Sequence, residues 1–94
     1  MEVRLKVYFS FRTKIDTDGK SSVKVPDGAT VSEALEVISS RFPGFQDRVL
    51  NENGQPKRFV QIKVNRRNVN RLNGLSTELK KDDEIIILPK LGGG

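Results

Sequence analysis

The chain has 94 residues, of which 35% are hydrophobic and 31% are charged, and its formal net charge is +5. This length suffices for one domain with one modest core, and the composition is that of a small fold dominated by its surface. Cysteine and histidine are both absent, which excludes a disulfide, a thiolate nucleophile, an imidazole base and a zinc site built from these side chains.

The first predicted elements are two strands that form a hairpin. From Val3 to Phe11 apolar residues alternate strictly with polar ones, and this period of two indicates a strand with one buried face. Residues 16–19 (Asp-Thr-Asp-Gly) supply turn chemistry. Val23 and Val25 then alternate with polar residues in a second, shorter strand, which we expect to pair antiparallel with the first.

The main helix is predicted over residues 30–42. Thr30 and Glu33 fit a capping box, in which the threonine hydroxyl accepts from an early helical N–H and the glutamate returns to the cap. Apolar residues behind them fall on one helical face, and residues 43–44 (Pro-Gly) end the helix. A short second helical turn is expected over residues 45–50, followed by a loop.

The third predicted strand covers residues 60–64, where apolar and polar residues alternate. The polar, asparagine-rich stretch 65–73 follows, and we expect Val69 to lie in a brief edge strand there. Leu75 and Leu79 are expected to plug the core from a connecting segment.

The last predicted strand covers residues 84–88. It is apolar on both faces, which suits a central strand, and Pro89 is expected to stop it. A single main helix covers only one face of such a sheet, so the sequence predicts an α+β fold with one solvated face that can serve as a docking surface. We expect one domain over residues 1–90 and a flexible glycine tail over residues 91–94.

Carboxylates remain as candidates for metal or acid–base chemistry, and none falls in a recognisable pair. We interpret Asp82-Asp83-Glu84 as a turn that opens a strand rather than as a metal site. Asp16 and Asp18 before Gly19 resemble part of a calcium loop, but the glutamate that such a loop needs at its end is missing. The sequence predicts no active site, and we do not expect an enzyme.

The positive charge favours acidic partners, with nucleic acid as an alternative. A nucleic-acid binder usually adds a basic helix or stacking aromatic residues among its cations, and here only Phe59 is interleaved. We therefore expect a solvated or partner-facing basic patch. Much of the charge lies in Lys57, Arg58, Lys63, Arg66, Arg67 and Arg71.

The sequence predicts an intracellular, cytoplasmic protein. No run of residues approaches the length needed to span a bilayer. Residues 1–4 alternate charge with apolar side chains, unlike a signal peptide. We expect no membrane association and a monomer.

Three consecutive glycines, Gly92, Gly93 and Gly94, follow Leu91. Glycine has no Cβ, so such a tail can thread a channel too narrow for other residues, and its backbone can lie against a ligand. We interpret this tail, with its α-carboxylate, as the functional group. The alternative is a frayed terminus without a role.

The order of elements resembles the ubiquitin-like β-grasp fold, which implies a mixed sheet of four to five strands with the first and last strands side by side at its centre. Segments 58–65, 73–79 and 82–89 resemble the sulfur-carrier proteins MoaD, ThiS and CysO, and the small archaeal modifier proteins share the pattern. The likeness is sharp only from residue 58 onward. Lys90 departs from the family, since many relatives have a second proline there, and Gly92 occupies a position that is usually small but not always glycine.

The resemblance implies that Gly93 and Gly94 are the working pair. An E1-like adenylating enzyme of the MoeB or ThiF type would activate the Gly94 carboxylate with ATP and magnesium. That enzyme would bind the nucleotide, because this chain has no phosphate loop of the G-x-x-x-x-G-K type. Sulfur would then attack to give a thiocarboxylate for a sulfur-accepting enzyme. In the alternative route, an enzyme cysteine passes the acyl group to a lysine of a target protein.

The residues before the glycines are expected to serve the docked tail. Leu88, Pro89 and Leu91 would seat its base in an apolar groove of the partner, although Leu91 could equally serve strand-end packing. A further alternative for the whole protein is a non-covalent interaction domain in which the glycines have no role.

Overall fold

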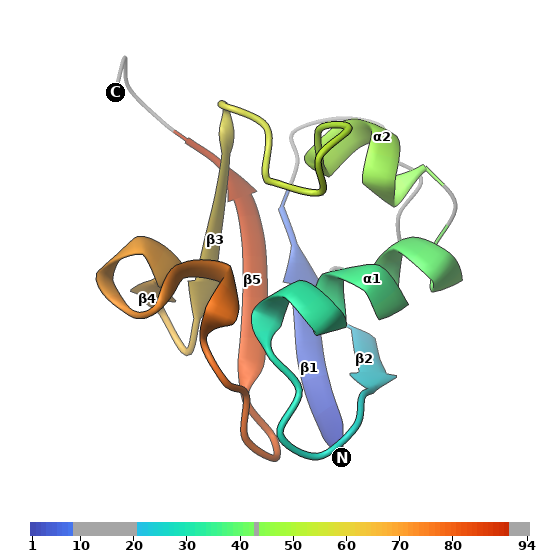
Figure 1. Cartoon of the computed structure of the whole chain (residues 1–94), viewed down its shortest axis with the longest axis vertical. Coiled ribbons are helices and arrows are strands. Elements are labelled where there is room, and N and C mark those ends of the chain that lie inside the picture. Colours follow the sequence, from blue (N-terminus) through green and yellow to red (C-terminus); the bar gives the residue numbers. More distant parts are fainter. Residues whose placement is uncertain (9–20, 43, 91–94) are drawn as a thin grey trace.

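A five-stranded mixed sheet is the frame of the structure, a computed structural model that describes residues 1–8, 21–42 and 44–90 (Figure 1). The strands lie in the order β2-β1-β5-β3-β4. Their bounds are Glu2–Val7 for β1, Ser21–Lys24 for β2, Val60–Val64 for β3, Arg67–Asn68 for β4 and Glu84–Pro89 for β5.

The first and last strands lie side by side at the centre of the sheet, as the resemblance implied. β1 and β5 are parallel, with Arg4 opposite Glu84 and Val7 opposite Ile87. β5 is antiparallel to β3 on its other side. β2 pairs antiparallel with β1, which confirms the predicted hairpin partners.

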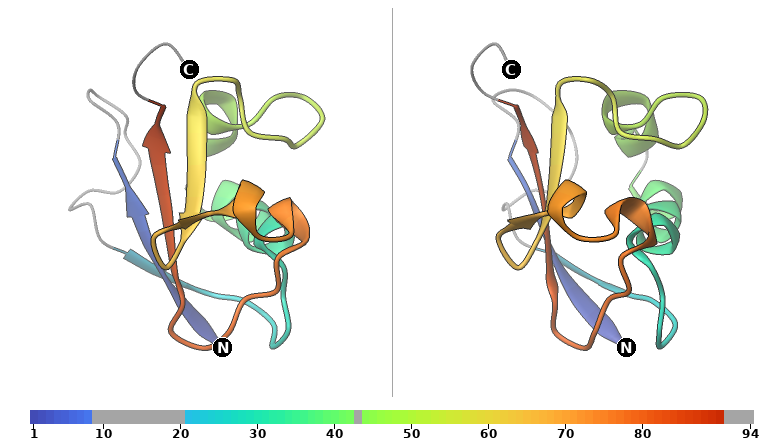
Figure 2. Two further views of the ribbon diagram at one scale, coloured as in Figure 1. Left: turned by 90° about the vertical axis from the view of Figure 1, so that its left-hand side faces the viewer. Right: turned by 60° about the vertical axis from the view of Figure 1, so that its left-hand side comes forward.

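Two helices cover one face of this sheet, and none of the described helices covers the other, which we call the open face (Figure 2). The main helix α1 spans Val31–Arg41, and its predicted capping box is present. The Glu33 N–H donates to Thr30 Oγ1 at 3.2 Å, and the Thr30 N–H donates to Glu33 Oε1 at 2.8 Å. The short helix α2 spans Phe45–Val49, within the predicted helical turn.

The core lies between the helices and the covered face of the sheet. Strand residues alternate in burial, so the side chains that face α1 are excluded from water while their neighbours face the open side. Full burial of a large apolar side chain stabilises a fold by about 1.5–3 kcal/mol. The largest fully buried side chains include Leu5, Leu35, Ile38, Phe45, Leu79, Ile85 and Ile87.

The segment after β4 differs from its sequence prediction. Val69 is not part of the edge strand but begins a 3₁₀ helix, η1, that spans Val69–Arg71. The cause is local: the Asn68 side chain accepts a hydrogen bond from the Asn70 N–H at 2.8 Å. This contact caps the turn and ends the strand at Asn68. A second 3₁₀ helix, η2, spans Gly74–Ser76.

One predicted strand extends further than expected, and the end of another lies outside the described residues. β5 includes Pro89, which pairs with Val60, so the proline does not stop the strand before itself. Of the first predicted strand, residues 9–11 lie outside the described residues, as do the turn at 16–19 and Pro43.

Candidate functional site

The base of the predicted tail lies at the end of β5. Leu88 and Pro89 are the last residues of this strand. The Lys90 N–H donates to the Phe59 carbonyl at 2.8 Å, which holds the chain beside the start of β3. Leu91, Gly92, Gly93 and Gly94 lie outside the described residues. The structure therefore fixes the point at which the predicted tail begins.

At Pro89 the hydrogen bonding of β5 toward β1 differs from its hydrogen bonding toward β3. Neighbouring residues of a strand donate to opposite sides, and Lys90 donates toward β3, so the nitrogen of Pro89 faces the β1 side. Proline has no N–H to offer there. In the described residues, the last hydrogen bond between the β1 chain and β5 runs from the Tyr8 N–H to the Ile87 carbonyl at 2.7 Å. Among the described residues, the base of the tail is thus held from the β3 side.

Two exposed aromatic side chains flank this end of β5. Tyr8, which follows β1, is 49% exposed, and Phe59, which precedes β3, is 54% exposed. The alternation of β1 and the register with β5 place Tyr8 and the half-buried Leu88 on the open face. Phe59 lies in the turn before β3, and its carbonyl accepts the Lys90 N–H at the same end of the sheet. We call Tyr8, Phe59 and Leu88 the tail-base surface.

Exposed aromatic residues that gather at one place are typical of a protein interaction site. Leu88 was predicted to have this role from the sequence, whereas Tyr8 and Phe59 were not. The alternation of the first strand already places Tyr8 among Arg4 and Lys6 on its polar side. An aromatic side chain on the polar face of a strand was the signal in the sequence that could have indicated an interaction site.

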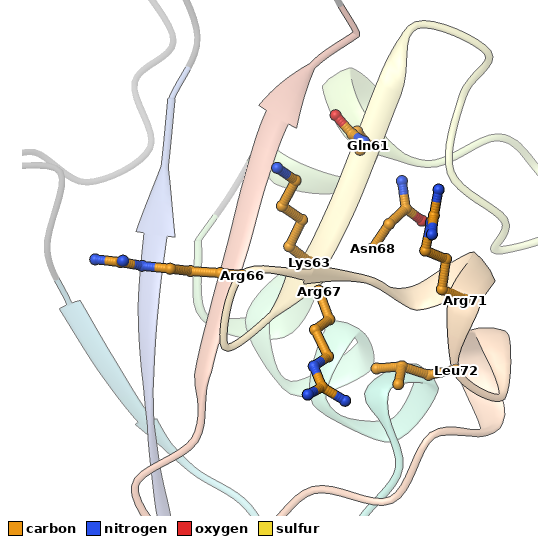
Figure 3. Close-up of a pocket in the computed structure, with 7 residues that line it drawn as sticks. All are labelled: Gln61, Lys63, Arg66, Arg67, Asn68, Arg71 and Leu72. Atoms are coloured by element: carbon orange, nitrogen blue, oxygen red, sulfur yellow. The ribbon is translucent and has the colours of Figure 1, made fainter.

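Four of the six basic residues singled out in the sequence come together. They line a groove of about 600 Å³ beside the β3–β4 hairpin and η1, shown in Figure 3. Lys57 and Arg58 are not part of it, and the Lys57 ammonium instead donates to the Asp47 carbonyl. The groove residues are Gln61, Lys63, Arg66, Arg67, Asn68, Arg71 and Leu72.

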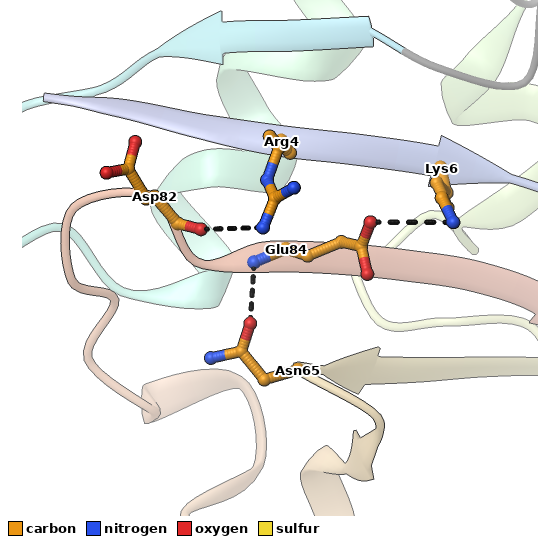
Figure 4. Close-up of polar contacts among 5 residues, drawn as sticks. All are labelled: Arg4, Lys6, Asn65, Asp82 and Glu84. Atoms are coloured by element: carbon orange, nitrogen blue, oxygen red, sulfur yellow. Dashed lines mark hydrogen bonds and ion pairs between the residues drawn. The ribbon is translucent and has the colours of Figure 1, made fainter.

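The other end of β5 is tied by side chains (Figure 4). The Glu84 N–H donates to Asn65 Oδ1 at 2.9 Å, and the Asn65 amide donates to Asp83 Oδ1 at 2.8 Å. Lys6 Nζ lies 3.7 Å from Glu84 Oε2 on the open face. Asp83 Oδ2 also accepts the Lys80 N–H at 2.8 Å. These contacts confirm that the acidic triplet 82–84 forms the turn into the last strand.

A metal-binding cluster and a membrane-spanning helix are both absent from the described residues. Within residues 1–8, 21–42 and 44–90, no three acidic side chains are arranged to hold a metal ion. None of the helices in this part combines the length and the apolar character that a bilayer span requires. The candidate calcium-loop residues Asp16, Asp18 and Gly19 lie outside the described residues.

Comparisons with known proteins agree with the fold described above. The model of the ThiS family matches residues 7–94. Small archaeal modifier protein 3 of Haloferax volcanii is 31% identical over 96 residues, and the match covers all of both chains. The sulfur carrier protein CysO of Mycobacterium tuberculosis is 31% identical over 80 residues, which cover 83% of this chain and 85% of CysO.

A solved structure supports the same assignment. A chain of the BexX/CysO complex of Amycolatopsis orientalis is 33% identical and superposes with a TM-score of 0.70, covering 98% of this chain and 99% of that chain. These matches confirm the resemblance to sulfur carriers and archaeal modifiers, and with it the ubiquitin-like β-grasp fold.

Proposed function

The chain belongs to the ThiS family, and from this premise we propose that it is a sulfur carrier and not an enzyme. Its reactive group would be the carboxylate of Gly94. A partner enzyme of the E1-like MoeB or ThiF type would bind ATP and magnesium. This chain would supply the tail and a surface that the enzyme recognises.

The proposed chemistry follows from the weakness of a carboxylate as an electrophile. Its negative charge repels nucleophiles, and oxide is a poor leaving group. Attack of the Gly94 carboxylate on the α-phosphorus of ATP would release pyrophosphate and form an acyl adenylate. A hydrosulfide nucleophile would then attack the carbonyl carbon and expel AMP. The product is a thiocarboxylate, whose sulfur can be passed to an acceptor enzyme.

The observation that carries this proposal is the way in which β5 presents the base of the tail. The strand is fixed in the centre of the sheet up to Lys90. Tyr8 and Phe59 lie exposed on either side of it. A partner that covers this surface would meet the tail at a reproducible position, and reproducible positioning is what acyl transfer requires.

A second candidate function is protein modification. The match to a small archaeal modifier protein over the full length of both chains favours it. In that route a cysteine of the enzyme system would displace AMP to form a thioester. A lysine amine of a target protein would then attack the thioester and form an isopeptide bond with Gly94. Both functions need the same tail and the same docking surface.

The test is intact-mass analysis of the purified full chain. The chain is incubated with an E1-like enzyme from the same source, ATP, magnesium and sulfide. We expect one oxygen of the chain to be replaced by sulfur, in a reaction that depends on ATP. A variant without Gly93 and Gly94 should gain no sulfur while its unfolding midpoint stays unchanged.

The same chain, expressed with an affinity tag on its N-terminal side, separates the candidates in cells. Conjugates in which Gly94 is joined to target lysines, and which disappear with the glycine deletion, would favour the modifier. If neither a thiocarboxylate nor conjugates were detected, the remaining candidate would be a non-covalent interaction domain, and the proposal would be overturned.

A further inference from the structure

The groove beside the β3–β4 hairpin is a second candidate surface, and its charged lining residues are all basic. Lys63, Arg66, Arg67 and Arg71 line it, and none of the described residues that line it is acidic (Figure 3). The three arginines are exposed and Lys63 is half-buried. Among the described residues, these four cations take part in no ion pair. The nearby acids Glu84 and Asp83 are engaged with Lys6 and Asn65.

Arg66 occupies a backbone position at which glycine is the usual residue. Asn65 and Arg66 form the two-residue turn between β3 and β4, with φ of 51° and 74°. A turn with two positive φ values favours Asn followed by Gly, because a Cβ is strained there. Asn65 meets the first preference and ties the strands. Arg66 violates the second, and strain of this kind is typical of a functional residue.

We propose that this groove binds an acidic segment of a partner protein through aspartate and glutamate side chains. Guanidinium groups recognise carboxylates with paired hydrogen bonds, and three of the four cations are arginines. Nucleic acid is disfavoured because no aromatic side chain for base stacking is among the described residues that line the groove. The exposed aromatic residues lie instead at the tail-base surface.

The groove adjoins the tail-base surface. Gln61, which lines the groove, is opposite Leu88 in the sheet, and Lys63 is opposite Ile86. The part of the groove formed by Gln61 and Lys63 therefore lies beside the open face of β5, within reach of a partner seated there. The inference rests on the proposed function only in naming the protein that handles the tail as the owner of the acidic segment. The groove would then select that partner by charge, beside the apolar contact.

The test is titration of the isotope-labelled full chain with a short peptide of alternating glutamate and aspartate, followed by NMR. Amide shifts should be confined to β3, β4 and η1, and the affinity should fall as salt is added. Arg67→Gln and Arg71→Gln should each weaken binding roughly two- to fivefold. Arg66→Gly should weaken binding similarly while raising the unfolding midpoint, because it relieves the strained turn.

Matched controls keep the result specific. Lys24→Gln removes the same charge from β2 at the opposite edge of the sheet and should leave the affinity unchanged. A variant without residues 92–94 should bind the peptide as well as the full chain does, so a failure of the proposed tail chemistry would not change this result. Equal binding of a glutamine–asparagine peptide, or an equal effect of Lys24→Gln, would overturn the proposal. Tighter binding of oligothymidylate would also overturn it.

Discussion

The two ends of β5 are held in different ways. At Glu84 side chains from β1 and from the β3–β4 turn contact the strand, through Lys6 and Asn65. At Lys90 the contact is a backbone hydrogen bond to Phe59, whose ring stays exposed. Side-chain hydrogen bonds and an ion pair thus fix the first end, and apolar area is left exposed at the second.

This difference implies that stability and binding can be separated along one strand. Substitutions near Glu84 should weaken the fold, and substitutions near Leu88 should weaken recognition by a partner. Four sets of variants test that separation, in decreasing order of the change we expect.

Ile85→Ala should cost about 3 kcal/mol of unfolding free energy, because it removes most of a fully buried side chain and leaves a cavity in the core. Leu88→Ala, on the same strand but half-buried, should cost about 1 kcal/mol, since less apolar area is lost. Chemical denaturation with matched samples measures both. Equal costs would show that the tail end of β5 is as much part of the core as its beginning.

Asn65→Ala should cost about 2 kcal/mol, because two side-chain hydrogen bonds are lost and alanine is strained at positive φ. Asn65→Gly removes the same hydrogen bonds but tolerates the backbone, so its cost should be about 1 kcal/mol. Thermal or urea unfolding measures both variants, and the difference between their unfolding free energies is the cost of backbone strain. If both variants were neutral, the side-chain ties at Glu84 would not stabilise the strand.

Phe59→Ala should lower the rate of sulfur loading at limiting enzyme about tenfold, as expected for the loss of an exposed aromatic side chain that anchors a protein contact. Its unfolding free energy should change by less than about 1 kcal/mol, because the ring is 54% exposed. Phe59→Tyr keeps the ring and is the control. Loading that is unaffected in the alanine variant would place the docking surface elsewhere.

Lys6→Gln should have the smallest effect, about 0.3–0.5 kcal/mol, because the 3.7 Å pair with Glu84 is partly exposed to solvent. The loss should disappear in high salt, which screens the pair in the parent protein as well. Unfolding curves at low and high ionic strength measure it. A larger, salt-independent cost would mean that the aliphatic part of Lys6 packs on the sheet.

Local signals in the sequence were sufficient for most of the fold. The capping box at Thr30 and Glu33 involves neighbours in the chain, and alternation at residues 60–64 reports burial directly. Val69 was misassigned because a single hydrogen bond from Asn70 to the Asn68 side chain decides between strand and turn. The order of the strands came from the family resemblance rather than from any local pattern.

The candidate site was predicted only in part, for a physical reason. Tyr8 and Phe59 come to lie near Leu88 through the pairing of three strands, and no spacing in the sequence encodes that pairing. The basic residues formed a single set in the sequence, yet Lys57 and Arg58 precede β3 and do not line the groove. The roles of the residues from Leu91 to Gly94 stay predictions, because these residues lie outside the described part of the structure.

The parallel pairing of β1 with β5 has a consequence for folding kinetics. It joins Arg4 to Glu84, so the centre of the sheet closes only after almost the whole chain has been synthesised. Such long-range contacts slow folding relative to a helical protein of similar size. The nascent chain therefore holds its first strand without its main neighbour, and a chain that stops before residue 84 cannot complete the sheet.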